Sequence, residues 1–327
     1  MLEHVFTALR SRQGEWVSGE GLSRELSISR SAVWKHVSTL RRQGYGIESS
    51  PRKGYRLTRA PALLSPREIR MGLDTRVFGR KEIFISKETD STNTQALMLA
   101  SQGAPEGTLV AAESQSRGRG RRGRTWFSPP GKGLYLSMVL RPGIAPARAP
   151  ALTLIAGLAA VEALRSLYPG LDARIRWPND VMINNRKAGG ILTEIAGDMD
   201  EVGFAVTGLG LNVDFREFPP ELQNRATSLA LETGRSADRA SLARCFLEIY
   251  ESYWGSFIRG STEPLFERWR KLSLSLGRQV TVETSAGIVS GVALDIGEDG
   301  SLLVRDSQGR VHNVFSGDLR FQDGNSC

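Results

Sequence analysis

The residues of this chain best suited to chemistry form an arginine- and glycine-rich run between Gly118 and Arg124. Glycine tolerates positive φ, so backbone N–H groups in such a run can converge on an anion, and the guanidinium groups add fixed positive forks. This composition predicts phosphate binding, although Arg/Gly runs are also typical of disordered RNA-binding tails. Apolar segments at 109–112 and 134–140 predict buried strands on either side, which favours a loop within a folded sheet. We call residues 115–126 the arginine loop and expect it to be mobile until an anionic ligand binds.

Two further clusters offer polar groups or a close backbone approach. Residues 88–93 place hydroxyls and an amide at an expected helix start, where they either cap the helix or hydrogen-bond a neutral polar ligand. For Ser91 taken alone, capping is the preferred interpretation. Residues 208–213 form an expected strand with glycines at alternate positions, which indicates either a β-bulge or a floor for a planar ligand.

A lysine and an aspartate lie in an expected hairpin. Asp180 sits in a tight turn, and Lys187 shortly precedes the glycine pair at 189–190, where the backbone can approach a ligand closely. The alternative is a surface hairpin with a solvated lysine.

Histidine is missing from the region that holds these clusters, since His4, His36 and His312 lie outside residues 65–275. This excludes imidazole there as a general base, as a member of a nucleophilic triad or as a metal ligand. Cations, backbone amides and hydroxyls remain. That inventory suits phosphate chemistry, in which positioning and charge neutralisation do most of the catalysis.

The elements that position these clusters follow from the hydropathy pattern. Short connections between the later strands favour hairpins, so the predicted architecture is α+β, with a mixed, largely antiparallel sheet and helices packed on one face. From residue 276 onward, short strands and turn signals predict a small SH3-like β-barrel. The expected strands are 81–86, 107–112, 133–141, 173–177, 181–184, 190–196, 202–213, 279–284, 288–295, 301–305 and 311–316; the expected helices are 92–101, 151–167, 239–257 and 264–274; residues 214–235 are expected to be loop-rich.

The N-terminal residues 1–64 predict a winged helix-turn-helix. Expected helices at 4–12, 21–26 and 30–43 are followed by a hairpin at 47–57. The net charge of the chain is +8, and residues 1–60 hold eleven Lys and Arg against five Glu, which predicts a polyanionic partner. We therefore expect DNA binding, while a basic module that binds protein, or a vestigial domain, is the alternative. The candidate DNA-binding residues are Arg30, Ser31, Trp34 and Lys35 on the third helix and Arg52 and Lys53 on the wing.

The composition as a whole predicts a soluble, cytoplasmic protein of two or three domains. The chain has 327 residues and lacks an apolar run long enough to span a membrane or a basic-then-apolar leader. Its two cysteines, Cys245 and Cys327, are far apart in sequence, which predicts reduced thiols and no tightly bound metal.

The chemical clusters, taken in order, resemble the motifs of biotin protein ligases. With the helix-turn-helix in front, the chain resembles the bifunctional ligases that also repress a biotin operon. The resemblance implies a winged helix-turn-helix DNA-binding domain at 1–64, a biotin protein ligase catalytic domain at 65–275 and a C-terminal SH3-like β-barrel at 276–327. The motifs are Asp-Ser-Thr-Asn at 90–93, Gln-x-x-Gly-Arg-Gly-Arg-Arg-Gly-Arg-x-Trp at 115–126, Trp-Pro-Asn-Asp at 177–180, Lys-x-x-Gly-Ile-Leu at 187–192 and Gly-x-Gly-x-Asn-Val at 208–213.

The resemblance also implies a reaction and its partners. Biotin and ATP, with Mg²⁺, would give biotinyl-5′-AMP, which then acylates a lysine of a biotin carboxyl carrier protein domain. Operator DNA would be a further partner, bound by a homodimer that forms when the adenylate is present. Carrier protein would compete for the dimer surface.

The implied site residues fall into three groups. Biotin would be held by Ser91, Thr92, Asn93, Gln115, Arg119, Gly120, Arg121 and Lys187, with Ser91 and Asn93 on the ureido ring. The nucleotide would be held by Arg121, Trp126, Asn179, Lys187, Gly208, Gly210 and Asn212. Lys187, Arg119 and Asp180 would be catalytic, with Asp180 acting through Mg²⁺ or through the incoming lysine.

Two residues depart from the family pattern, and three other functions compete with this one. Arg176 stands where lysine is usual before Trp-Pro-Asn-Asp, and Arg117 adds a charge to the arginine loop. The rivals are a lipoate-protein ligase, a transcription regulator that only senses a vitamin or nucleotide, and an RNA-binding protein. The arginine loop favours biotin over lipoate, Lys187 disfavours a mere sensor, and the flanking strands disfavour the RNA-binding protein.

Overall fold

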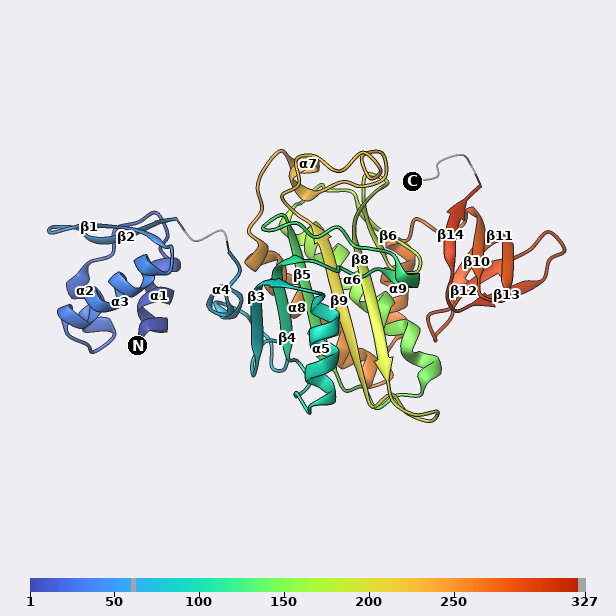
Figure 1. The fold of residues 1–327 in the computed structure, drawn as a ribbon, viewed down its shortest axis with the longest axis horizontal. Coiled ribbons are helices and arrows are strands. Elements are labelled where there is room, and N and C mark those ends of the chain that lie inside the picture. Colours follow the sequence, from blue (N-terminus) through green and yellow to red (C-terminus); the bar gives the residue numbers. More distant parts are fainter. Residues whose placement is uncertain (60–62, 323–327) are drawn as a thin grey trace. The chain divides into compact units, whose positions relative to one another are not determined.

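The computed structural model describes residues 1–59 and 63–322, and it divides into two compact units, Met1–Met71 and Gly72–Cys327 (Figure 1). Each unit has its own buried core. Cys327 and part of the connector before residue 65 lie outside the described residues.

The first unit has the expected winged helix-turn-helix order. Ser29 caps α3 (Arg30–Arg42) by accepting a hydrogen bond from Ala32 N at 3.2 Å. On the same helix the Trp34 side chain is 57% exposed. Gly54 closes the β-hairpin with φ +94°, and a Cβ there would lie 2.1 Å from Val17 O. A side chain at this turn would therefore displace the wing. The elements are α1 (Leu2–Arg10), α2 (Gly19–Glu25), α3 (Arg30–Arg42), β1 (Gly46–Ser50), β2 (Gly54–Arg59) and α4 (Pro66–Arg70).

The second unit is built on a seven-stranded sheet in the order β3-β4-β5-β9-β8-β7-β6. β3 and β4 are parallel and the other neighbouring pairs are antiparallel, which confirms the predicted mixed sheet. Its strands are β3 (Ile83–Thr89), β4 (Leu109–Gln115), β5 (Gly133–Leu140), β6 (Ala173–Arg176), β7 (Asp180–Ile183), β8 (Arg186–Ala196) and β9 (Phe204–Asn212).

The helices of this unit cover both faces of the sheet. The longest ones, α6 (Ala149–Leu167) and α8 (Arg239–Ile258), lie behind it in Figure 1, with α9 (Glu263–Leu272) packed on α6. By contrast, α5 (Thr92–Ser101) lies across the front, where Ala96 and Ala100 pack on Val110, Val139 and Val206. The expected placement of helices on one face therefore describes α6 and α8 but not α5.

One helix in the described part of the chain, within Pro146–Leu167, is long and apolar enough to cross a membrane by length and composition. Most of it is buried inside the unit, as expected of a core helix packed between a sheet and a second helix.

The C-terminal strands form a five-stranded antiparallel sheet in the order β13-β12-β11-β10-β14, which confirms a small all-β domain. Neither the short helix α7 (Leu229–Thr233) nor the strand β14, which returns to pair with β10, was predicted. The strands are β10 (Gln279–Thr284), β11 (Gly287–Ile296), β12 (Leu302–Arg305), β13 (Val311–Val314) and β14 (Asp318–Phe321).

Candidate active site

A cavity of about 640 Å³ opens on the face of the sheet that carries α5. The start of α5, the arginine loop, the β7–β8 hairpin and β9 line it. All of the biotin-binding, nucleotide-binding and catalytic residues predicted in this unit contribute to the lining: Ser91, Thr92, Asn93, Gln115, Arg119, Gly120, Arg121, Trp126, Asn179, Asp180, Lys187, Gly208, Gly210 and Asn212.

At the start of α5, Ser91 occupies the cap position, but its side chain makes no capping hydrogen bond. The local preference for capping was therefore wrong. Asp90 accepts the Ser91 N–H at 2.6 Å instead, and Gln115 Oε1 accepts the Thr92 N–H at 2.8 Å. Ser91 is buried and lines the cavity, and its hydroxyl is not used to cap the helix.

The arginine loop folds back on itself as a short hairpin. Gly120 N donates to Arg124 O at 2.7 Å, and Trp126 N donates to Gly118 O at 2.8 Å. A Cβ at Gly118 would lie 2.3 Å from Trp126 O, so the close approach of the two arms requires glycine there.

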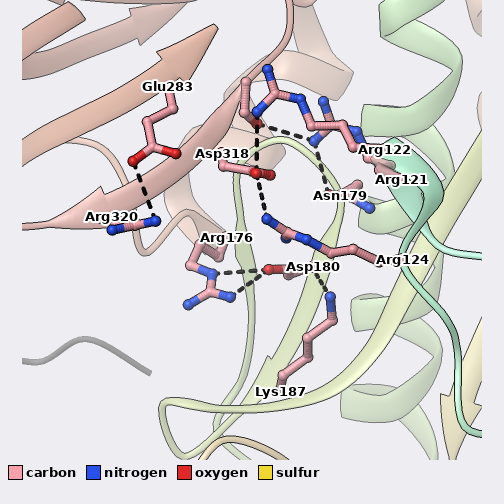
Figure 2. A network of polar contacts seen from close by, with 11 residues as sticks. Arg121, Arg122, Arg124, Arg176, Asn179, Asp180, Lys187, Glu283, Asp318 and Arg320 are labelled. Carbon is pink, nitrogen blue, oxygen red and sulfur yellow. Dashed lines mark hydrogen bonds and ion pairs between the residues drawn. The ribbon is translucent and has the colours of Figure 1, made fainter. Parts of the chain in front are cut away.

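The arginines of this hairpin are paired across the cavity. Arg119 Nη2 lies 2.6 Å from Glu194 Oε1, and Arg121 Nη1 donates to Asn179 Oδ1 (3.3 Å) and Gly317 O (3.2 Å). Figure 2 shows Arg122 and Arg124 directed at Asp318 of the C-terminal sheet, with the Arg122 contact at 3.2 Å. Burial lowers the pKa of Arg121, an effect that Asp318 and Asp180 oppose. The loop and the C-terminal sheet thus form one wall.

Asp180 and Lys187 meet in the same cavity. Lys187 Nζ lies 2.5 Å from Asp180 Oδ1, while Arg176 donates to Oδ2 at 2.6 and 3.0 Å (Figure 2). Burial raises the pKa of Asp180, but the charges of Lys187 and Arg176 outweigh it, so the net pKa is below the usual value. The carboxylate is therefore ionised at neutral pH, and the lysine is ion-paired rather than merely solvated.

The glycines of β9 form a floor. Gly208 and Gly210 pair without a register shift to β5 on one side and β8 on the other, so the bulge interpretation is wrong. A Cβ on Gly210 would lie 2.6 Å from Trp126 Nε1. Lys187 Nζ is 5.6 Å from the centroid of the Trp126 ring. The indole consequently lies against bare backbone, beside the ammonium group.

Two parts of the wall were missed from the sequence. One is residues 317–321 of the C-terminal sheet, and the other is the segment before α7 that supplies Phe218, Leu222, Arg225 and Ala226. Both are distant in sequence from the motifs, and neither has a composition that signals a ligand. Arg117, flagged as an added charge, is not part of the lining.

Among residues 1–59 and 63–322, no group of three or more His, Cys, Asp or Glu side chains could hold a metal ion. The acids nearest the cavity, Asp180, Glu194 and Asp318, are each already paired with one or two cations.

Known proteins resemble the chain along nearly its whole length. The "Bifunctional ligase/repressor BirA" of Bacillus subtilis is 39% identical over 93% of this chain and 94% of that protein. The chain belongs to the bifunctional biotin ligase/repressor family. The same-named protein of Escherichia coli is 35% identical over 94% of this chain and 93% of its own.

Three family models match successive segments of the chain, in the order expected from the sequence. An HTH domain matches residues 2–56, the Biotin/lipoate A/B protein ligase family matches 85–212, and the Biotin protein ligase C terminal domain matches 275–318. A biotin protein ligase from Aquifex aeolicus, solved in complex with biotin and ATP, superposes with a TM-score of 0.65 at 30% identity, covering 74% of this chain and all of that one.

Proposed function

We propose that this biotin ligase condenses biotin with ATP to biotinyl-5′-AMP, transfers the biotinyl group to a lysine of a biotin carboxyl carrier protein domain, and represses biotin synthesis genes by binding operator DNA. The observation that carries the enzymatic part is that one cavity is lined both by buried Ser91, Thr92 and Asn93 and by the cations Lys187, Arg119 and Arg121. A neutral ring system and a phosphate chain each find suitable partners there.

In the first step, a biotin carboxylate oxygen bonds to the α-phosphorus as the bond to the bridging oxygen breaks and pyrophosphate leaves. No protein nucleophile is needed. Lys187 lies beside the reacting carboxylate and phosphate and stabilises the charge that develops, while Asp180 and Arg176 hold its side chain. Arg119, Gly120 and Arg121 cover biotin and the phosphates.

The lining residues are divided between the two substrates. We assign the part of the cavity near Ser91, Thr92, Asn93 and Gln115 to biotin and call it the biotin end. We assign the nucleotide end to Trp126, Asn179, Gly210 and Asn212, where bare backbone lets a flat group approach, together with Gly208, which adjoins Asn93. In the second step, a carrier lysine attacks the acyl carbon, loses a proton and releases AMP.

Mg²⁺ is assigned to ATP rather than to a resident site, because Asp180, Glu194 and Asp318 are paired with cations. Bound to the phosphates, it would supply charge neutralisation of the leaving pyrophosphate.

The N-terminal unit is assigned to DNA. Its third helix and wing carry the candidate contacts Arg30, Ser31, Trp34, Lys35, Arg52 and Lys53. An adenylate-dependent homodimer would place two such units on two half-sites, and carrier protein would compete for the dimer surface. The proposed boundaries between the functional domains lie at residues 64/65 and 275/276. The proposed location of the protein is the cytoplasm.

The enzymatic proposal is tested by incubating the protein with biotin, MgATP and a purified carrier domain. Mass spectrometry should show a carrier heavier by one biotinyl group, with lipoate giving no product. Transfer of lipoate in place of biotin would move the protein to the rival ligase class. The repressor proposal fails if the biotin- and ATP-saturated protein stays monomeric in sedimentation and binds a palindromic operator no better than the apo protein.

A further inference from the structure

Beneath the cavity, a continuous series of side-chain hydrogen bonds joins one arm of the arginine loop to the other. At one end Arg119 Nη2 donates to Glu194 Oε1 at 2.6 Å. The other carboxylate oxygen, Oε2, accepts from Asn93 Nδ2 at 2.9 Å. Glu194 therefore bridges one arm of the arginine loop and the buried start of α5.

The series continues inward through groups that are almost completely buried. Ser137 Oγ is 2.7 Å from Asn93 Oδ1 and 2.8 Å from Thr92 Oγ1. Ser137 is fully buried, and Thr92 and Asn93 are 5% and 4% exposed. A Cβ at Gly208 would lie 2.0 Å from Asn93 Oδ1, so Asn93 rests directly on the β9 floor.

From Thr92 the series reaches the second arm of the loop. The Thr92 N–H donates to Gln115 Oε1 (2.8 Å), and Gln115 Nε2 donates to Ser128 Oγ (2.9 Å). Ser128 Oγ donates in turn to Trp126 O at 2.9 Å. Trp126 is the last residue of the arginine loop, so the series connects both arms of the loop through the buried start of α5.

The number of available protons limits these bonds. Each hydroxyl has one proton, so Ser137 Oγ donates to Asn93 Oδ1 or to Thr92 Oγ1, and the Thr92 hydroxyl lies 3.2 Å from Gln115 Oε1, to which it can donate in turn. The two amide protons of Asn93 are used by Leu192 O (3.0 Å) and Glu194. Asn93 and Arg119 therefore donate to different oxygens of residue 194, and a carboxylate presents an acceptor at both of those positions.

The geometry points to Glu194 as a positioning residue of the ligase, one that acts through Arg119 and Asn93 to couple closure of the arginine loop to occupation of the biotin end, with Ser137 as the buried link. This inference rests on the proposed function. None of the motifs in the sequence includes Glu194 or Ser137. The coupling requires no new contact with substrate, since it works by holding Arg119 over the cavity.

The test compares Glu194→Gln with Glu263→Gln, which removes the same charge from an ion pair with Arg270 (2.6 Å) elsewhere in the unit. A glutamine at 194 offers one oxygen and leaves either Arg119 or Asn93 without its partner. We expect the KM for biotin to rise about tenfold in Glu194→Gln, from loss of a charge-assisted bond, with a smaller change in kcat. Glu263→Gln should match the wild type.

Loop order is read independently by trypsin, because the arginine loop is itself a substrate for that protease. Biotin with ATP should slow cleavage in the wild type and in Glu263→Gln, and should protect Glu194→Gln much less. If Glu194→Gln fails to fold, Glu194→Asp, which keeps both oxygens, and Ser137→Ala, which cuts the link, are compared in the same way. Protection equal to wild type in Ser137→Ala would overturn the inference.

Equal KM and equal protection in Glu194→Gln and Glu263→Gln would likewise overturn the coupling while leaving the ligase assignment intact. A wild-type protein that gives no biotin-dependent product would instead refute the proposed function.

Discussion

Lys187→Ala separates the catalytic account from a merely structural one. The change removes the ammonium group 2.5 Å from Asp180 Oδ1 and 5.6 Å from the Trp126 ring centroid. Asp180 keeps both of its bonds to Arg176, at 2.6 and 3.0 Å, so it is not left as an unpaired buried charge. The fold should therefore tolerate the substitution.

The expected loss of stability in Lys187→Ala is much smaller than the expected loss of kcat. The Lys187 side chain is 32% exposed, and losing one partner of a partly exposed ion pair costs about 1 kcal/mol at most. For a domain of this size, that is a fall in Tm of about 2–4 °C. Removing one preorganised positive donor from a transition state costs about 10²–10³-fold in kcat, or about 3–4 kcal/mol.

The assay is biotin-dependent release of pyrophosphate from ATP at saturating substrate, measured beside a thermal unfolding curve. Lys87→Ala, a change at an exposed lysine of β3, is the matched control and should behave as wild type. DNA binding at high protein concentration should persist in Lys187→Ala. Wild-type turnover in Lys187→Ala, or a loss of activity explained by unfolding, would refute the reasoning.

Three further outcomes follow from the structure. Gly210→Ala puts a methyl group 2.6 Å from the indole Nε1 of Trp126 and should raise the KM for ATP more than that for biotin; unchanged kinetics would remove the indole from the nucleotide end. Because the folded pKa of Asp180 is lowered, its stabilising contribution is complete above the ordinary value of about 4 and is lost as pH falls through the lower folded value. Urea unfolding at pH 7 and pH 3 should therefore show a smaller acid-induced loss of stability in Asp180→Asn than in wild type, and an equal loss would contradict the ion pairing. Trp34→Ala removes a side chain 57% exposed on α3 and should weaken operator binding while pyrophosphate release stays unchanged; unaltered DNA affinity would exclude this helix face.

Local patterns predicted much of the molecule because the relevant physics is local. Alternating charge and glycine, set between apolar segments, predicted a basic loop inside a sheet, and the structure places the arginine loop between β4 and β5. The helix at 30–43 was predicted, and in the structure the Ser29 side chain caps its start by accepting a hydrogen bond from Ala32 N. The resemblance to biotin protein ligases implied one shared site for the motif residues, and the structure places them around one cavity.

The predictions failed where contacts with residues distant in the sequence determine the local structure. Ser91 and Asp90 are both good helix caps by type, and in the structure Asp90 accepts the Ser91 N–H while Gln115, from the end of β4, accepts the Thr92 N–H. α5 is apolar around much of its circumference, so its pattern could not select the opposite face of the sheet. Asp318 reaches the cavity because β14 (Asp318–Phe321) pairs with β10. A segment of four residues is too short for its sequence pattern to predict that pairing.

The central claim is that this cavity makes an acyl-adenylate. Mass spectrometry of the purified protein after incubation with biotin and MgATP, without carrier, tests it most directly. The account predicts a retained ligand with the mass of biotinyl-5′-AMP and one pyrophosphate released per active site. Formation of ADP and phosphate, or the absence of any biotin-dependent nucleotide product, would contradict it.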